Sequence, residues 1–300
     1  MLQNISGKIR LTTQKVVFFY NKKAQLAVFL SFFVSSLTMK SAKTLLNYSK
    51  KLAKRINKIL KKSSDRYNVE DYHRLRTEIK KLNALFDLLQ FFSEHFKREK
   101  YFKPAKKIFM RAGKVRELQL EEATLKEYVS FSFEHYLRDI QKQVKKEETD
   151  FHAVITKKRK ALLKKNFKEI IPFLEAVPPK KVTAYFEKKR KDISDIIQKK
   201  PLQPLQVHEL RKRLKIDFYN KQSCRLPGSQ LEEENNFQEL LGKWHDSRTM
   251  NDLLEKSIIH QEIDPTELNQ LIEIRDEISA SSRELLKEIN ALLDSKTLFG

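Results

Sequence analysis

The chain has 300 residues, which is enough for one large domain or two small ones. Hydrophobic residues make up 40% of it while glycine (5) and proline (8) are scarce, so the composition favours long helices over sheets and argues against a disordered chain. The formal net charge of +22 points to polyanionic partners such as nucleic acid, anionic membrane or phosphate chains.

The positive charge is unevenly distributed along the sequence. Residues 231–300 contain 16 acidic and 7 basic residues, so residues 1–230 carry a net charge of +31. The single cysteine, Cys224, excludes a disulfide framework or a Cys-based zinc site within one chain, and it fits a reducing compartment. We therefore expect a cytoplasmic protein, unless the N-terminal segment directs it elsewhere.

That N-terminal segment contains an uncharged run of 16 residues, 24–39, preceded by basic residues. The run is shorter than the roughly 20 residues of a spanning helix and is close to the core of a signal peptide. Three interpretations stay open. Residues 1–38 are an extension upstream of the true start at Met39, a signal or membrane anchor that would export or tether the protein, or a helix packed on the main domain.

The main domain, residues 39–300, is expected to be helical throughout. Apolar residues at three-to-four spacing and the breaks between them predict helices at 43–62, 69–97, 104–129 and 131–175, with "SSDRYN" (63–68) as the first break and Pro104 near the first turn of the third helix. The first of these helices has eight basic residues and no acidic residue, and the last carries seven basic residues between Lys157 and Lys168.

"VPPKK" at 177–181 is the clearest break in the chain, and it divides the domain into halves at about 39–176 and 177–300. After it we expect a helix at 182–199 and a second helix between the "PLQP" turn and the "CRLPGS" loop. Two further helices are expected at about 231–259 and at 265–294. Thr266 or Asp264 is expected to cap the last helix.

A basic helix pattern, His-x-Leu-Arg followed by lysine, occurs in each half. On a helical wheel His73, Arg76, Lys80 and Lys81 gather on one face, opposite an apolar face. A single helix of this kind is ordinarily a solvated surface helix. The second copy, 135 residues later, makes a shared function more plausible than coincidence.

The second copy repeats the basic residues better than the apolar ones. His208, Arg211 and Lys215 match the first copy, Lys212 adds charge to the same face, and Tyr219 lies near it. Arg213 lies about 140° from His208 on the wheel, so we expect it to point elsewhere. The apolar face is interrupted, because Asp217 stands where the first copy has Leu82.

A second repeated motif follows each basic helix at an offset of 129 residues. "GKVRE" (113–117) aligns with "GKWHD" (242–246), so Arg116 and Glu117 match His245 and Asp246. A glycine within a helix suggests the close approach of another helix, and the acid is expected to orient a basic side chain. Two halves with the same order of motifs predict an internally duplicated fold.

The residues bear on three other kinds of function. General RNA or DNA binding by a basic helical protein is the alternative to phosphate-chain binding, although no RNP motif, zinc finger or helix-turn-helix is present. An enzyme is not expected, because the sequence has no Gly-x-x-x-x-Gly-Lys loop, and the scattered histidines predict no metal site or cofactor. Contact with an anionic membrane through residues 1–62 is compatible with either kind of binding.

The four motifs, in this order, resemble those of the CHAD domain family, which is named for its histidine and its α-helical domain. The family shows His-x-x-Arg-x-x-x-(Arg/Lys)-(Arg/Lys)-Leu, here His73 to Leu82, and a later Leu-Gly-x-x-(Arg/Asn)-Asp, similar to "AGKVRE" and "LGKWHD". The resemblance covers residues 40–295. It implies an all-α fold of two antiparallel helical bundles related by approximate two-fold symmetry, with basic residues around a central groove or cavity.

The resemblance also implies non-catalytic binding of inorganic polyphosphate, which is compatible with an association with polyphosphate granules in the cytoplasm. The candidate ligands are the basic residues of the motifs: His73, Arg76, Lys80, Lys81, Arg116, His208, Arg211, Lys212 and Lys215, supported by Glu117, Asp246 and Tyr219. Glu117 replaces the usual aspartate. Ile216, Asp217 and Phe218 depart from the family pattern, which suggests weaker binding by the second half or the use of Lys212 and Arg213 there.

Overall fold

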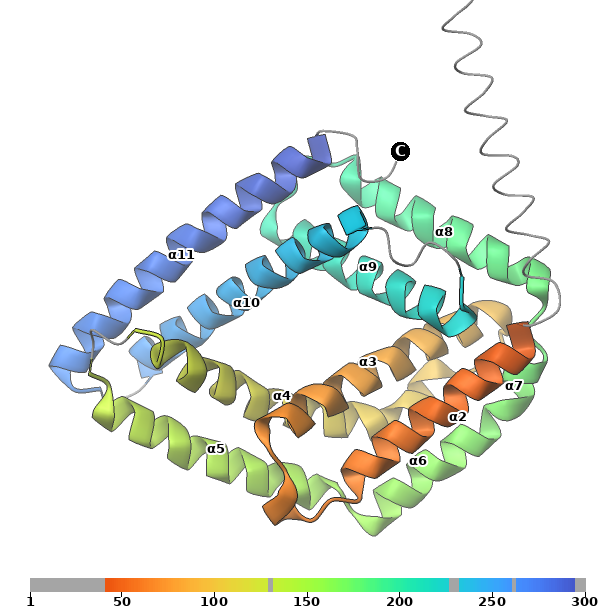
Figure 1. The fold of residues 1–300 in the computed structure, drawn as a ribbon, viewed down its shortest axis with the longest axis horizontal. Helices are drawn as coiled ribbons and strands as arrows, with labels where there is room; N and C mark the ends of the chain where they lie inside the picture. Colours follow the sequence, from red (N-terminus) through yellow and green to blue (C-terminus); the bar gives the residue numbers. More distant parts are fainter. Residues whose placement is uncertain (1–40, 129–131, 227–231, 261–262, 295–300) are drawn as a thin grey trace, which may run out of the picture.

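The computed structural model describes residues 41–128, 132–226, 232–260 and 263–294, and all regular structure in these ranges is helical (Figure 1). The elements are α2 (Ser41–Leu60), the short 3-10 helix η1 (Ser64–Arg66), α3 (Val69–Phe92), α4 (Arg98–Leu125), α5 (Glu134–Val154), α6 (Lys157–Glu169), α7 (Ile171–Glu175), α8 (Pro179–Ile197), α9 (Pro204–Cys224), α10 (Glu232–His260) and α11 (Pro265–Asp294). The predicted all-α fold is confirmed.

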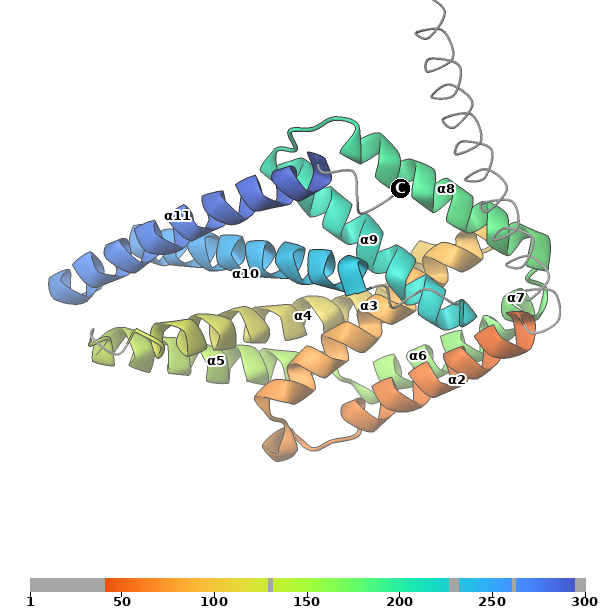
Figure 2. The same ribbon diagram turned by 45° about the horizontal axis from the view of Figure 1, so that its top comes forward.

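Four helices form the middle of the molecule. Helix α3 contacts α4 and α9, and α10 contacts α4 and α9, so the helices that carry the two pairs of repeated motifs meet one another. Helices α2, α6, α7 and α8 lie on one side of this centre, whereas α5 and α11 lie along the other (Figures 1 and 2). The arrangement brings segments about 135 residues apart in sequence side by side.

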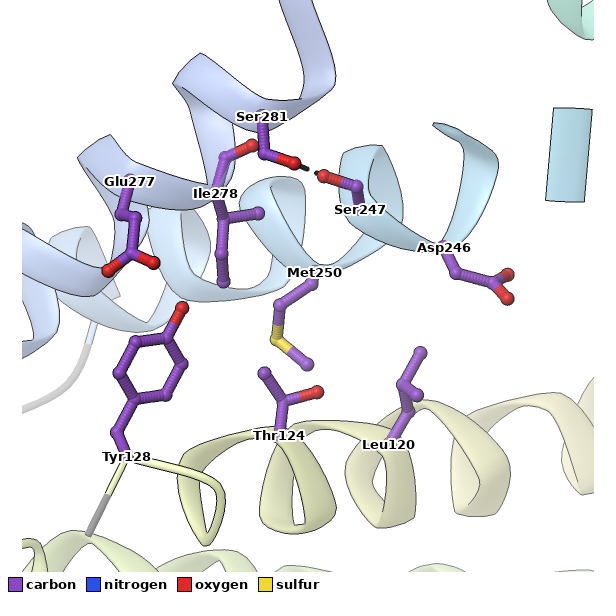
Figure 3. Close-up of a pocket in the computed structure, with 9 residues that line it drawn as sticks. All are labelled: Leu120, Thr124, Tyr128, Asp246, Ser247, Met250, Glu277, Ile278 and Ser281. Carbon is purple, nitrogen blue, oxygen red and sulfur yellow. Dashed lines mark hydrogen bonds between the residues drawn. The ribbon is translucent and has the colours of Figure 1, made fainter. Parts of the chain in front are cut away.

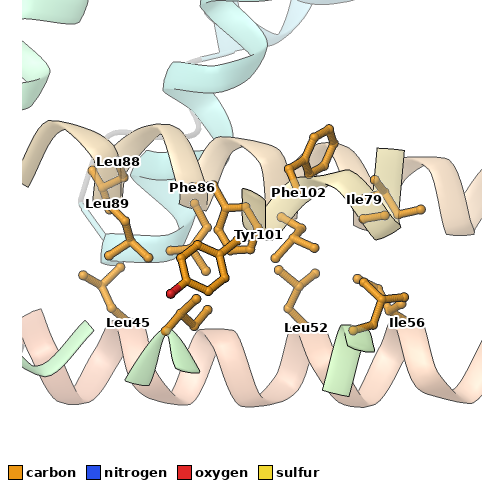
Figure 4. Packing of buried hydrophobic residues seen from close by; sticks show 14 of the residues in the cluster. Leu45, Leu52, Ile56, Ile79, Phe86, Leu88, Leu89, Tyr101 and Phe102 are labelled. Atoms are coloured by element: carbon orange, nitrogen blue, oxygen red, sulfur yellow. The ribbon is translucent and has the colours of Figure 1, made fainter. Parts of the chain in front are cut away.

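The largest buried core lies between α2 and α3. Leu45, Leu52 and Ile56 form an apolar stripe on α2 and are at most 2% exposed. They face apolar side chains of α3 and the aromatic rings of Phe86 and Tyr101 (Figure 4). Because burial of a leucine or isoleucine side chain contributes about 1.5–3 kcal/mol, this stripe accounts for much of the attachment of α2.

Two smaller buried cores include residues of α10 and α11. Trp244 of α10 is buried with Val207 and Leu210 of α9 and Ile289 of α11. The third core joins the halves, because apolar residues of α4 and α5 pack there against apolar residues of α10 and α11. Beside it, the buried carboxylate of Glu267 accepts hydrogen bonds from the backbone N–H groups of His135 (2.9 Å) and Tyr136 (3.0 Å), the first turn of α5.

A polar junction at Asp87 fixes α3 to three other helices. The Asp87 carboxylate accepts a hydrogen bond from the Tyr185 hydroxyl (2.7 Å) and pairs with Lys189 (2.7 Å) on α8 and with Arg98 (3.3 Å) on α4. The Tyr185 hydroxyl in turn accepts from the Asn220 amide of α9, which also donates to the Ala84 carbonyl. The junction therefore sets how α9 lies against α3.

Three of the predicted helices have different bounds in the structure. The helix expected at 69–97 ends at Phe92, and Ser93 is its C-cap in an extended conformation. Helix α4 begins at Arg98, six residues before Pro104, because the Arg98 guanidinium bonds to Asn83 (2.9 Å) and pairs with Asp87 on α3, which holds the first turn in place. The helix expected at 131–175 is three helices. The Thr156 hydroxyl caps α6 by accepting from the Arg159 N–H (3.1 Å), and Pro172 lies in the first turn of α7.

The predicted C-terminal helices are confirmed, and Asp264 is the cap of the last one. Its carboxylate accepts from the backbone N–H groups of Thr266 (2.9 Å) and Glu267 (3.3 Å). The boundary between halves near residue 177 and the internal duplication stay predictions. Helix α8 begins at this boundary, yet its Val182 and Tyr185 are buried in the same core as α2 and α3. The run at 24–39 lies outside the described residues.

Candidate functional site

Arg76 of α3 is held against α4. Its Nη1 donates a hydrogen bond to the Phe109 carbonyl (3.1 Å), and its guanidinium carbon lies 4.4 Å from the centroid of the Phe109 ring. Burial lowers the pKa of Arg76, Glu117 opposes this shift, and Arg116 adds to it. The side chain therefore occupies a fixed place beside both members of the first Arg-Glu pair.

Gly113 makes room for that arginine. A Cβ atom at position 113 would lie 3.2 Å from Arg76 Cζ and closer still to Nη1. The sequence suggested the close approach of a neighbouring helix, and the approaching group is a side chain of α3. At the matching Gly242, a Cβ would meet no atom within 4 Å. The two repeated glycines therefore have different surroundings.

Lys80 lies one turn along α3 from Arg76. It keeps contact with solvent, yet its pKa is lowered to about 8, first by the surrounding protein and then by Arg76, Arg211 and Lys215, with Asp246 opposing. The basic faces of α3 and α9 therefore meet, as the repeated motif predicts.

On α9, Arg211 is less tightly held than Arg76. Its Nε is buried and, among the described residues, finds no hydrogen-bond partner. Burial lowers its pKa, while Asp246 and Tyr219 oppose the shift. One turn further, the pKa of Lys215 is lowered by burial and by Arg211, and its Nζ lies 5.8 Å from the centroid of the Phe218 ring.

Two histidines complete the group. The rings of His208 on α9 and His245 on α10 lie 5.3 Å apart between centroids. The pKa of His245 is lowered to about 4 by burial and then by Arg211, His208, Lys80 and Arg76. The pKa of His208 is lowered by burial and by Lys212, Arg211 and Arg248, with Glu209 opposing. Both rings are therefore neutral at pH 7.

These residues form one group, which we call the central cluster: Arg76, Lys80, His208, Arg211, Lys215 and His245. All of these residues except His245 are among the ligands expected from the sequence, and the alignment of His245 with Arg116 was a signal for it. The Phe109 support for Arg76 and the contribution of Arg248 were missed, because neither belongs to a repeated motif. The nearby acids are Glu117 and Asp246, so the cluster has excess positive charge.

The other expected ligands lie at the edge of the cluster or face elsewhere. His73 is exposed, Lys81 pairs with Glu78 (2.9 Å), and the exposed Lys212 pairs with Glu209 (2.8 Å). Arg213 also pairs with Glu209 (2.7 Å), away from the cluster, as the wheel suggested. The geometry brings together Arg76, Lys80, Arg211 and Lys215 more closely than it does these residues.

A cavity of about 240 Å³ lies between α4, α10 and α11 (Figure 3). It reaches the cluster only through Asp246. Its wall includes apolar side chains such as Met250, the hydroxyls of Thr124 and Ser247, and the carboxylate of Glu277, but no basic side chain. The cavity is therefore unsuited to a polyanion.

The described residues offer neither a metal site nor a membrane span. No group of three or more His, Cys, Asp or Glu side chains in these ranges is arranged to hold a metal ion. None of the helices in the same ranges is both long enough and apolar enough to cross a bilayer. The central cluster offers several N–H donors from three helices, a chemistry that suits an anion with several oxygens.

Comparison with known proteins identifies the family of the chain. A profile of the CHAD domain matches residues 50–255, whereas no curated protein matches the chain. The CHAD domain from the plant Ricinus communis has a similar structure, with a TM-score of 0.64, 12% identity, and coverage of 86% of this chain and 93% of the plant chain.

PptA from Streptomyces chartreusis is similar as well, with a TM-score of 0.60, 13% identity, and coverage of 83% of this chain and 98% of its own. At these identities the two structures show the shared fold alone. The profile match extends over well more than half of the 300 residues. The chain therefore belongs to the CHAD domain family.

Proposed function

We propose that the central cluster binds inorganic polyphosphate without catalysing a reaction on it. The CHAD family is linked to polyphosphate binding in general, and its members are typically non-catalytic binding domains. The observation that supports the proposal is the gathering of cations from two helices around Lys80, whose pKa is lowered by burial and then by Arg76, Arg211 and Lys215. His245 of a third helix, α10, lies close enough to Arg211, Lys80 and Arg76 for these cations to lower its pKa as well. Cations held this close together repel one another unless an anion lies between them.

The chemistry of the cluster suits a phosphate chain. Polyphosphate offers only oxygens, with about one negative charge per phosphate. Arginine can bind two oxygens with its planar fork, and lysine supplies a more mobile charge. The neutral histidines become donors on both nitrogens when a polyanion raises their pKa. We therefore expect salt-sensitive binding with little preference for chain length or chain ends.

Polyphosphate fits the cluster better than RNA or DNA. Single-stranded nucleic acid is usually held by aromatic rings on which bases stack. Two of the rings at the cluster already carry cations, because Arg76 lies over Phe109 and Lys215 lies over Phe218. A phosphate chain has no bases and does not need these rings.

A competition experiment on the full chain tests the proposal. Labelled long-chain polyphosphate is displaced with unlabelled polyphosphate, RNA and DNA, and its affinity is measured for the double variant Arg76→Ala/Arg211→Ala. The matched control, Arg190→Ala/Lys191→Ala, removes the same charge from exposed positions of α8. We expect polyphosphate to compete best and the Arg76/Arg211 variant to lose at least tenfold in affinity, about 1.4 kcal/mol.

Two outcomes contradict the proposal. Equal competition by nucleic acid would show a general polyanion binder. Equal loss of affinity in the α8 control would show that the overall charge, rather than the central cluster, attracts the ligand. Circular dichroism and thermal unfolding of each variant separate loss of binding from loss of fold.

A further inference from the structure

Arg76 contacts two positions on one face of α4. Phe109 and Gly113 are four residues apart, so they lie one above the other on the helix. Phe109 supplies a carbonyl acceptor and a ring surface, while Gly113 leaves the space that the guanidinium fills. Only one of the five N–H groups of Arg76 is used by the Phe109 carbonyl, so others remain available to an anion.

In the second half of the cluster, Arg211 has no matching contact with the repeated glycine. A Cβ atom at position 242 would have no neighbour within 4 Å, so Arg211 does not lie across Gly242. The buried Nε of Arg211 also lacks a partner among the described residues. The repeated glycine therefore positions an arginine in the first half only, a difference that the aligned motifs conceal.

We propose that Gly113 is a positioning residue for polyphosphate binding, because it lets α4 hold Arg76 in the orientation that meets the anion. The guanidinium of Arg76 is then already oriented for the ligand, whereas that of Arg211 changes its orientation when the ligand binds. This inference rests on the proposed function. An arginine that is already fixed loses little further freedom on binding, so displacing it weakens the complex even though its charge is retained.

The test is a matched pair of glycine substitutions in the full chain. Gly113→Ala and Gly242→Ala both replace a helical glycine with the residue that favours helices most, so neither is expected to lower helix content. At position 113 the new methyl group displaces the flexible end of Arg76. We expect Gly113→Ala to weaken binding of long-chain polyphosphate about tenfold and Gly242→Ala to leave it unchanged.

A double-mutant cycle separates positioning from a general structural effect. Once Arg76 is replaced by alanine, Gly113 has no guanidinium to accommodate, so Gly113→Ala should cause no further loss in the Arg76→Ala background. If Gly113→Ala does not fold, Phe109→Leu provides the same cycle, because it removes the ring while the backbone carbonyl remains. A smaller loss is then expected, again only when Arg76 is present.

The outcomes distinguish this inference from the proposed function. If the wild-type chain does not bind polyphosphate, the proposed function fails and the inference fails with it. If the wild type binds and Arg76→Ala weakens it, but Gly113→Ala binds normally, only the inference is overturned. Equal losses from Gly113→Ala and Gly242→Ala, or an undiminished loss in the Arg76→Ala background, also overturn it.

Discussion

At the scale of single residues, we expect the proposed binding of polyphosphate to depend on pH through Lys80. Its pKa of about 8 in the free protein arises from the surrounding protein and from Arg76, Arg211 and Lys215, and Asp246 acts in the opposite direction. A bound polyanion favours the charged ammonium and raises this pKa. The complex therefore holds more protons than the free protein, so affinity falls as the pH rises through 8.

We expect the affinity for polyphosphate to fall about tenfold between pH 7 and pH 9 because of Lys80, since the free side chain loses most of its charge over this range. The variant Lys80→Arg keeps its charge throughout and should flatten the profile. Dissociation constants are measured across the range at constant ionic strength. Parallel profiles for the wild type and Lys80→Arg would refute this role for Lys80.

His245 adds a second proton-linked group at lower pH. It is neutral at pH 7 because burial and four basic neighbours lower its pKa to about 4. A polyanion between these neighbours raises the pKa, so binding takes up a proton where the pH lies between the free and bound values. Calorimetric titration at pH 6 in two buffers of different ionisation enthalpy measures this uptake. We expect the uptake to decrease in His245→Asn, and an unchanged value would argue against contact with His245.

At the scale of elements, the Asp87 junction determines where α9 lies. Asp87→Ala leaves Lys189, whose side chain is only 9% exposed, without its partner, and it removes the acceptor of the Tyr185 hydroxyl. Breaking a buried ion pair on one side costs about 3 kcal/mol or more. We expect a loss of unfolding free energy of this order in urea denaturation. Asp276→Ala, an exposed position on α11, is the control and should change stability by less than about 0.5 kcal/mol.

Periodicity predicted the basic faces of α3 and α9 but not their individual partners. A helical wheel places Arg76, Lys80 and Lys81 on the solvent side of α3 alike. The packing of α9 against α3 brings Lys80 near Arg211 and Lys215. Lys81 instead pairs within α3 with Glu78, which also receives Arg55 from α2. The structure brings together those predicted residues that face the centre of the molecule, whereas others, such as the exposed His73, lie outside this group.

Local sequence signals did not predict the helix ends that are set by contacts between residues distant in sequence. Pro104 suggested the start of a helix, but the bonds from Arg98 to α3 stabilise six earlier residues as helix. Thr156 is a good cap within an apparently continuous pattern, and its role was not visible because the residues on either side are equally helical in character. The contact between Phe109 and Arg76 depends on the position of α4 against α3, so no pattern within α4 predicts it.

At the scale of the whole molecule, the charge is far larger than the central cluster. Residues 1–230 carry +31, much of it on exposed lysines of α2, α6 and α8. Such lysines raise the rate at which a polyanion arrives, but each makes a weak and screened contribution to the final complex. The four lysines and arginines of the cluster, in contrast, are the residues that we propose contact one phosphate chain together.

The salt dependence of binding distinguishes these two contributions. Each cation that neutralises a phosphate adds roughly 0.7 to the slope of log affinity against log salt, by analogy with single-stranded nucleic acid. Contact with Arg76, Lys80, Arg211 and Lys215 therefore gives a slope of roughly −3 for a short polyphosphate. Arg76→Ala/Arg211→Ala should make the slope shallower by roughly 1.4 units, while Arg190→Ala/Lys191→Ala should leave it unchanged. A much steeper slope that decreases equally in both variants would place the phosphate chain on the outer lysines, because only a ligand spread over the whole basic surface is affected alike by charges removed from its centre and from α8.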